Sequence, residues 1–435
     1  MNYRQVYLKH GKEESLLRFH PWIFSGALHH IDNGISEGDV VRVVTADGHY
    51  AATGHYQGGS IAVRVLSFTD VPIDGTFWQQ RLRAAFEVRK ALGFLSYHPS
   101  VAGDLQSPAV EYRDLQSRHI TTAFRLVHGE GDMLSGLVID IYGRTAVMQA
   151  HSIGMHRSRH EIAEALSEVM GGNVANIYYK SETTLPFMST ENGFLLGGEE
   201  DDTALENGLR FHVDWLKGQK TGFFVDQREN RALVERYSQG RSVLNMFCYT
   251  GGFSFYAMRG GARLVHSVDS SAKAVELTRR NVELNFPGDR RHEAFCEDAF
   301  QFLDHPPLTI DHFHSDKSNA QPNGQSSMVN GQYDLIILDP PAFAKHRGAL
   351  HNALKGYIRL NKIAFTKIAP GGLLFTFSCS QVVTKDHFRN AVFTAAAQAG
   401  RSVRILHQLH QPADHPINIY HPEGEYLKGL VLYVE

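Results

Sequence analysis

The residues best suited to do chemistry follow an apolar segment in the last third of the chain. Residues 333–339 (YDLIILD) are almost wholly apolar before Asp339, and Pro340, Pro341 and Phe343 come directly after. The prolines stiffen the turn, the carboxylate can bond the edge of a nucleobase, and the aromatic ring can stack on a base turned out of its helix. This motif therefore predicts a site that holds a planar base or amine.

Glycines and carboxylates follow three earlier apolar segments. Gly251 and Gly252 come after VLNMFC, Asp269 ends LVHSVD, and Asp298 follows a shorter segment. In an open parallel sheet such residues meet beyond the carboxyl ends of the strands, where ligands bind. The glycines let the backbone approach a ligand, while Asp269 could accept from ribose hydroxyls and Asp298 from an exocyclic amine. The alternative is that the glycines serve helix packing and the two carboxylates cap helices.

Two nucleoside cofactors compete for this arrangement. A nicotinamide dinucleotide site requires the spacing GxGxxG to seat a pyrophosphate, and the run CYTGGFSFYAMRGG lacks it. A looser Gly-Gly turn is sufficient for a cofactor without phosphates, such as S-adenosylmethionine. The carboxylate of Asp269 suits either cofactor. The motif DPPAF favours the second, because class I methyltransferases hold planar targets at that position, so we expect S-adenosylmethionine.

The surrounding segments predict the α/β fold that positions these residues. Seven apolar segments between residues 243 and 434 alternate with helical stretches, which indicates a doubly wound, Rossmann-like sheet. Short β-branched segments near the N-terminus predict a small β-barrel module, in which we expect Trp22 and Phe24 to be core residues rather than base-stacking ones. The expected domains are 1–75 (small β-barrel), 76–203 (central α/β) and 204–435 (Rossmann-like).

Composition excludes several classes of protein. The chain has 435 residues, of which 43% are hydrophobic and 20% charged, unlike disordered, collagen-like or coiled-coil chains. No apolar stretch approaches the roughly 18–20 residues of a membrane span, and the polar N-terminus shows no secretory signal. Three cysteines point to a reducing cytoplasm, and 25 histidines without ligand spacing predict no metal site. The net charge of −3 argues against a strongly basic coat for nucleic acid.

Long segments from both ends of the chain carry a resemblance to a known family. They are FHPWIFSGAL, FRLVHGEGDMLSGLVIDIYG, KGQKTGFFVDQRENR, NMFCYTGGFSFYA, LIILDPPAFAK, APGGLLFTFSCS and HPEGEYLKGL. The sequence resembles the bacterial PUA-domain-containing class I 23S ribosomal RNA methyltransferases of the 5-methylcytosine group. The resemblance implies an N-terminal PUA domain, ribosomal RNA as partner and a homodimer. Apparent loop insertions near 95–118 and 306–331 depart from the pattern.

Within this family, Cys379 matches the position of the catalytic nucleophile. Cytosine C5 becomes nucleophilic only after a thiolate adds to C6, and a base must later remove the C5 proton before the thiolate leaves. Asp339 would bond the N3/N4 edge of the base and stabilise the adduct. No residue is assigned as the C5 base. We expect Cys248 and Cys296 to be small buried apolar residues.

The expected site residues fall into three groups. The catalytic residues are Cys379 and Asp339. The cofactor-binding residues are Gln227, Asn245, Phe247, Thr250, Gly251, Gly252, Asp269, Ser270, Asp298 and Asp339. The substrate-binding residues are Arg228, Pro340, Pro341, Phe343 and Lys345. Five basic residues follow DPPAF and either bind RNA phosphates or form a solvated helix face: Lys345, His346, Arg347, Lys355 and Arg359. Residues 217–231 either border the cofactor and target pocket or form a hairpin that packs beneath the sheet.

These observations predict an S-adenosylmethionine-dependent methyltransferase that forms 5-methylcytosine in large-subunit ribosomal RNA. One alternative is a methyltransferase of the N2-guanine type, because the motif DPPxF also serves amine targets that need no thiol. Another is an RNA-binding assembly factor that keeps the fold and the cofactor but turns over slowly. Replacing Cys379 with Ala separates the first two, and methyl incorporation tests the third.

Overall fold

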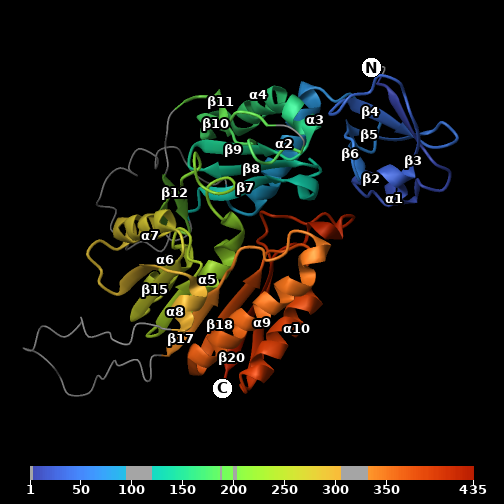
Figure 1. Ribbon diagram of the computed structural model, residues 1–435. Coiled ribbons are helices and arrows are strands. Elements are labelled where there is room, and N and C mark those ends of the chain that lie inside the picture. The colour runs from blue at the N-terminus through green and yellow to red at the C-terminus, as the bar shows by residue number, and fades with distance from the viewer. Residues whose placement is uncertain (1–2, 95–119, 187–188, 199–202, 305–331) are drawn as a thin grey trace, which may run out of the picture. The chain divides into compact units, whose positions relative to one another are not determined.

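The computed structural model describes residues 3–94, 120–186, 189–198, 203–304 and 332–435 (Figure 1). The insertions expected at 95–118 and 306–331 lie entirely outside the described residues. The contacts divide the chain into two compact units. The first comprises Met1–Asp226 with Pro412–Gly424, and the second comprises Gln227–Gln411 with Glu425–Glu435. Each unit is described separately below.

The first unit begins with the predicted β module, a six-stranded sheet in the order β2-β6-β5-β4-β1-β3. Its elements are β1 (Gln5–Leu8), α1 (Glu14–Leu17), β2 (Trp22–Phe24), β3 (Leu28–Ile31), β4 (Val40–Val44), β5 (Tyr50–Tyr56) and β6 (Ile61–Ser67). Alternate residues of these strands, including Val41, Val43, Val63 and Val65, form its core. The expectation that Phe24 is a core residue is wrong, because its side chain is 48% exposed. Trp22 is only half-buried, and its indole nitrogen donates to the carboxylate of Glu130 at 2.8 Å.

The central part of the first unit is a five-stranded sheet in the order β11-β10-β9-β8-β7, packed against α2 and α4. Its elements are α2 (Gly75–Ala91), β7 (Ala123–His128), β8 (Leu137–Tyr142), β9 (Thr145–Ala150), α3 (Ile153–Arg157), α4 (Arg159–Met170), β10 (Asn176–Tyr179) and β11 (Gly193–Leu196). Helix α2 begins where the carboxylate of Asp74 caps the backbone N–H of Phe77. A separate hairpin, β12 (Thr203–Glu206) and β13 (Leu209–His212), bonds to Thr122 through Leu205.

A buried ion pair joins α2 to the loop after β7. Arg89 is fully buried, and its guanidinium donates to the carboxylate of Asp132, with Nη2 at 2.9 Å from Oδ2. The same guanidinium donates to the carbonyls of Arg125 and Asp414, each at 2.8 Å. Each nitrogen of the buried Arg89 guanidinium thus donates to an oxygen. A buried charge is stable only when it is paired and hydrogen-bonded in this way.

The second unit contains the predicted seven-stranded sheet, in the order β16-β15-β14-β17-β18-β20-β19. Its strands are β14 (Ser242–Met246), β15 (Leu264–Asp269), β16 (His292–Cys296), β17 (Tyr333–Leu338), β18 (Ile368–Ser378), β19 (Val403–Leu409) and β20 (Lys428–Val434). The pairings from β16 to β18 are parallel, and β20 runs antiparallel to both β18 and β19. From β14, successive strands are added first on one side (β15, β16) and then on the other (β17, β18). Ligands are expected at the carboxyl ends of β14 and β17, where the order of the strands reverses.

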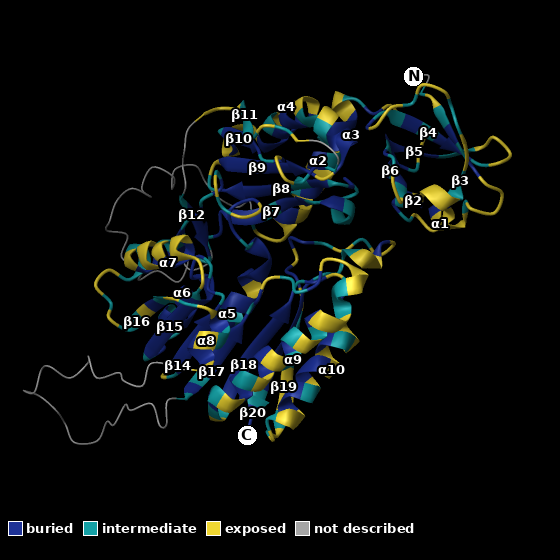
Figure 2. Ribbon diagram, in the orientation of Figure 1, coloured by how far each residue is buried: buried dark blue, intermediate teal, exposed yellow. Residues whose placement is uncertain are grey.

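Helices cover both faces of this sheet. They are α5 (Arg228–Tyr237), α6 (Gly252–Arg259), α7 (Ala272–Asn285), α8 (Ala299–Asp304), α9 (Leu350–Lys367) and α10 (Lys385–Gln398). Helices α8, α9 and α10 share one apolar core with the strands, and α6 and α7 contact β14, β15 and β16. Figure 2 shows the strands buried and the outer helix faces exposed. The doubly wound α/β fold is therefore confirmed. Among the described residues, no helix is long and apolar enough to cross a membrane.

The units divide the chain at different places from the boundaries predicted from the sequence. Residues 204–226 contact the first unit, because β12 and β13 bond to the segment before β7. Residues 412–424 also belong to the first unit, although the chain on either side of them lies in the second. Within that segment the carboxylate of Asp414 accepts from the backbone N–H of Arg125 at 2.9 Å. The first unit is consequently built from two separate stretches of sequence.

Candidate active site

The loop after β14 has an unusual backbone. Phe247, Tyr249 and Gly251 all have positive φ angles, of 58°, 48° and 84°. Residues with a Cβ rarely adopt this conformation, and such positions cluster at functional turns. A Cβ on Gly251 would lie 2.7 Å from Phe255 and from Thr278, so glycine is required here by packing as well as by φ. Gly251 therefore serves helix packing, which the sequence offered as an alternative to ligand binding.

The carboxylate of Asp269 holds this loop against the end of β15. One oxygen accepts from the backbone N–H of Tyr249 at 3.0 Å, and the other accepts from that of Ser271 at 2.9 Å. Each carboxylate oxygen can accept more than one hydrogen bond, so Asp269 can also accept from a ribose hydroxyl. The structure thus brings Asp269 to the same edge of the sheet as Phe247, Thr250 and Ser270.

Asn245, near the end of β14, is buried and has a side-chain oxygen without a hydrogen bond to the described part of the chain. The amide nitrogen of Asn245 donates to the hydroxyl of Ser254 at 2.9 Å, and its Oδ1 has no hydrogen-bond partner among the described residues. A buried acceptor without a donor is costly, and polar ligands often supply the missing donor. This orphaned oxygen, together with Asp269, fits a nucleoside cofactor at the end of β14.

Asp298 lies at the start of α8 and is exposed. Its Oδ1 accepts from the backbone N–H groups of Phe300 at 2.9 Å and Gln301 at 3.2 Å. This is the geometry of a helix cap, which the sequence offered as the alternative to cofactor binding by Asp298. One oxygen of Asp298 caps the helix, so any contact with a base amine would fall chiefly to Oδ2.

The two loops after β17 and β18 are bonded to one another. The hydroxyl of Ser380 donates to the carbonyl of Ala344 at 2.5 Å, and both residues are buried. Asp339 and Cys379 lie at the starts of these loops and are half-buried. Both interact electrostatically with Tyr357 of α9, and burial, together with these two groups, raises the pKa of Tyr357 to about 12. The phenol therefore stays neutral beside them.

Lys428, at the start of β20, is a second residue beside Cys379. Its ammonium is buried and donates to the carbonyl of Ser380 at 2.7 Å. Burial lowers the pKa of Lys428 to about 8, while the charges of Cys379 and Glu425 act in the opposite direction. Sequence reasoning missed both Lys428 and Tyr357. A lone lysine opening the apolar run KGLVLYV was the available signal for the first.

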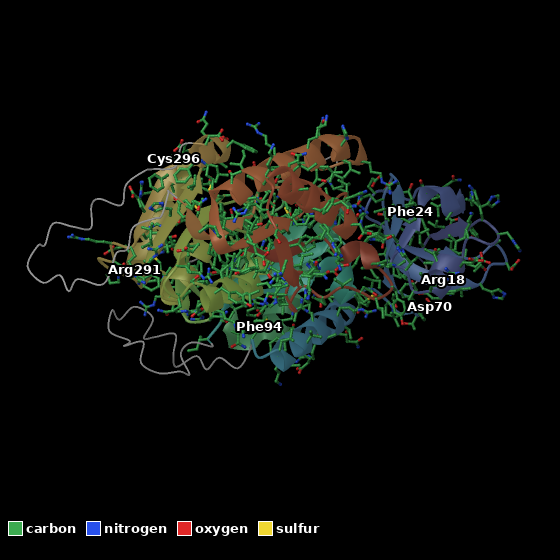
Figure 3. The ribbon with its side chains drawn as sticks, turned by 90° about the horizontal axis from the view of Figure 1, so that it is seen from below. Arg18, Phe24, Asp70, Phe94, Arg291 and Cys296 are labelled. Atoms are coloured by element: carbon green, nitrogen blue, oxygen red, sulfur yellow. The ribbon has the colours of Figure 1, made fainter. Side chains whose placement is uncertain are left out.

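The three cysteines have different environments. Cys379 is half-buried, whereas Cys248 is buried, and burial raises the pKa of the Cys248 thiol to about 12. The expectation that Cys296 is buried is wrong, because it ends the edge strand β16 and is exposed (Figure 3). Of the three, only Cys379 combines partial exposure with a position next to the motif DPPAF.

The aromatic ring and the prolines of DPPAF are partly packed. The ring of Phe343 lies against that of Tyr357, with centroids 4.7 Å apart, and remains half-buried. Pro340 is buried and Pro341 is exposed, so the turn has one anchored and one open residue. Lys345 beyond them is exposed.

The segment 217–231 is not a hairpin. Residues Val225–Gln227 form a single 3-10 turn, and α5 begins at Arg228. Both Gln227 and Arg228 are almost completely buried, and Gln227 accepts from the amide of Asn230 at 2.6 Å. Such burial favours a positioning role for Arg228 over direct contact with an RNA phosphate.

Comparison with known proteins identifies the family. A PUA-like domain matches residues 6–68, and an S-adenosylmethionine-dependent methyltransferase domain matches residues 177–304. A protein of Tolumonas auensis named ribosomal RNA large subunit methyltransferase I is 36% identical over 98% of each chain. The chain belongs to the methyltransferase I family. A second member, from Pseudoalteromonas translucida, is 37% identical over 99% of each chain.

Solved structures show the same fold. One from Streptococcus mutans, assigned to the S-adenosylmethionine-dependent methyltransferases, covers 99% of each chain with a TM-score of 0.76 at 22% identity. Another methyltransferase, in complex with S-adenosylhomocysteine, has a TM-score of 0.77 at 22% identity. The matching methyltransferase domain shows that S-adenosylmethionine is the cofactor of this methyltransferase I family member, as the sequence predicted. Asn245, Asp269 and the loop 247–251 remain the candidates for holding it.

Removing the carboxylate of Asp269 tests this assignment. We expect Asp269→Ala to weaken binding of S-adenosylhomocysteine by about 10- to 100-fold, since hydrogen bonds to a charged group contribute about 1.5–3 kcal/mol. Isothermal titration calorimetry measures the affinity. Asp298→Asn keeps an oxygen for the helix cap and serves as the matched control, with a smaller loss. Unchanged affinity in the Asp269 variant would remove this residue from the cofactor site.

Proposed function

We propose that this protein methylates C5 of a cytosine in large-subunit ribosomal RNA, with Cys379 as nucleophile. The supporting observation is that the loops carrying Asp339 and Cys379 are bonded together at the carboxyl ends of adjacent strands. A half-buried thiol beside a carboxylate is suited to covalent attack on a base held between them. The relatives named as large-subunit ribosomal RNA methyltransferases support the substrate class.

In the proposed reaction the thiolate of Cys379 adds to C6 of the cytosine, forming an S–C6 bond. The C5–C6 electron pair moves to C5, and Asp339 bonds the N3/N4 edge of the ring while this charge is present. S-adenosylmethionine, when bound, would supply the methyl group that C5 accepts, and its S–CH3 bond breaks to leave S-adenosylhomocysteine. Removal of the C5 proton then re-forms the C5–C6 double bond and expels the thiolate, which restores the enzyme.

Lys428 is proposed as the cation that favours the thiolate. The ammonium is held by the Ser380 carbonyl, directly after Cys379, and a nearby cation stabilises a thiolate. With a pKa of about 8, Lys428 is mostly charged at neutral pH and loses its charge as the pH rises above 8. Its effect on the thiol is therefore greatest below pH 8.

Replacing Lys428 with Met gives a pH-dependent defect. We expect methyl transfer to fall by about 10- to 100-fold at pH 7, because the loss of one nearby charge costs on the order of 1–3 kcal/mol of thiolate stability. The rate should partly recover towards pH 9, where the thiol ionises without help. Lys362→Met, an exposed position on α9, is the control. A uniform loss at every pH would contradict this role.

The RNA surface is proposed to include the basic residues after DPPAF. Lys345, His346, Arg347, Lys355 and Arg359 are all exposed, as phosphate contacts must be. Arg359 also lies over the ring of Phe300, with its guanidinium carbon 4.4 Å from the centroid. The group therefore has one member whose orientation is already fixed by the protein.

Identification of the methylated nucleoside tests the proposed function. Undermodified 23S ribosomal RNA from a strain that lacks the gene is incubated with the enzyme and S-adenosylmethionine, then digested for mass spectrometry. We expect 5-methylcytidine as the product. N2-methylguanosine would favour the base-amine alternative, and no incorporation despite cofactor binding would favour a role in assembly.

A further inference from the structure

Two histidines and a glutamate converge in the first unit, apart from the proposed active site. His20 precedes β2, whereas His421 and Glu423 belong to the segment 412–424. One ligand atom from each lies within 4.8 Å of the others. The Glu423 carboxylate is 3.7 Å from Nε2 of His20 and 3.8 Å from Nε2 of His421. Sequence spacing could not reveal this cluster, because its members come from opposite ends of the chain.

His421 is a buried polar group that lacks a hydrogen bond. The residue is 2% exposed, and neither ring nitrogen has a hydrogen-bond partner among the described residues. Its ring packs edge-on against Trp22, with centroids 4.3 Å apart, which fixes its orientation towards Glu423. A buried imidazole without a hydrogen bond among the described residues is costly, so a ligand bound at Nε2, which faces Glu423, would stabilise it.

His20 is oriented as a metal-binding histidine usually is. Its Nδ1 either accepts from the backbone N–H of Trp22 or donates to the carbonyl of Trp22, each at 3.2 Å, depending on the tautomer. When Nδ1–H donates to that carbonyl, the lone pair of Nε2 faces Glu423 and His421, and such an outer contact is common for histidine ligands. Glu130 lies nearby and accepts from the indole of Trp22 and the hydroxyl of Ser135. A second carboxylate close to the cluster favours a cation there.

We propose that His20, His421 and Glu423 bind a divalent transition metal of the zinc class. Two imidazoles and one carboxylate form a three-residue zinc set, with a fourth position left for water. Ligand atoms around a tetrahedral zinc ion lie roughly 3.4 Å apart, given bond lengths of about 2.0–2.2 Å. Glu423 is half-exposed and can rotate to close the remaining distance. Mg²⁺ prefers oxygen ligands and would not bind.

A bound metal ion would cross-link the segment 412–424 to the N-terminal β module through His20. It would connect the chain before β2 with a loop from the far end of the sequence, next to the exposed rings of Phe24 and Tyr420. The site is therefore structural, and its occupancy should alter local protection rather than chemistry at Cys379.

Zinc binding to the full-length protein tests the proposal. Chelator-treated protein is titrated with ZnCl₂, and with CoCl₂ to follow the visible absorption of a low-symmetry cobalt site. We expect one high-affinity ion per chain and slower amide exchange in residues 19–24 and 412–424. MgCl₂ should produce neither effect.

Variants identify the ligands. We expect His421→Phe, which keeps the ring contact with Trp22, and Glu423→Gln, which changes a half-exposed side chain, each to weaken Zn²⁺ binding at least ten-fold. His49→Gln, at an exposed turn of the same module, should bind as the unchanged protein does. If Glu423→Gln and His421→Phe retain the original affinity and stoichiometry, the proposed site does not exist.

Discussion

Replacing Cys379 with Ala should lower kcat/KM for methyl transfer to undermodified ribosomal RNA by about 10³-fold or more. Covalent addition at C6 is the step that makes C5 nucleophilic, and loss of a catalytic nucleophile typically removes several kcal/mol of transition-state stabilisation. Transfer of a labelled methyl group from S-adenosylmethionine to RNA measures the rate. The affinity for S-adenosylhomocysteine should not change, because Cys379 follows β18 and is not one of the expected cofactor-binding residues.

Cys296→Ala is the matched control for this experiment. It removes an exposed thiol at the sheet edge and should keep the rate of the unchanged protein. Retention of most activity by the Cys379 variant would contradict attack at C6 and favour transfer to a base amine, which needs no thiol. Cofactor binding by both variants would show that the fold of the second unit is intact.

Replacing Arg89 with Met should destabilise the first unit by about 3–5 kcal/mol, the usual cost of removing one partner from a buried ion pair. The side chain of Asp132 is only 5% exposed, so its charge would lose the cation that compensates it. The carbonyls of Arg125 and Asp414 would also lose a donor. Calorimetric unfolding measures the effect as a lower unfolding temperature of the affected transition.

Two further variants make this prediction specific. Arg83→Met changes an exposed arginine on the same helix and should shift stability by less than about 0.5 kcal/mol. Adding Asp132→Asn to Arg89→Met removes the uncompensated charge and keeps an acceptor for the backbone N–H of His128. We expect this double variant to recover part of the loss. No recovery would mean that the buried charge is not the cause.

The sheet of the second unit was predictable because its strands are continuous apolar runs. YDLIILD and GLLFTFSC cannot be amphipathic surface elements, and both form central strands, β17 and β18. The residues at their ends follow from the same argument, since parallel strands present their carboxyl ends at one edge. Asp339 and Cys379 were found in this way, the second with the help of family resemblance.

Other features depend on contacts between distant residues and left no local pattern. Phe24 looks like a core residue in FHPWIFSGAL, yet it ends β2 with its side chain 48% exposed. Cys296 lies in a strand-like segment, but that strand is the sheet edge. Lys428 reaches Ser380 only because β20 pairs antiparallel with β18, a register that the sequence does not encode locally.

The return of residues 412–424 to the first unit has a consequence for dissecting the protein. A fragment that stops at Asp226 would lack Asp414, and with it the acceptors for the backbone N–H of Arg125 and for the guanidinium of Arg89. Neither half can therefore be cut out as one uninterrupted piece. Any exchange of domains between relatives must carry the thirteen-residue excursion together with the N-terminal half, or supply it in trans as a peptide.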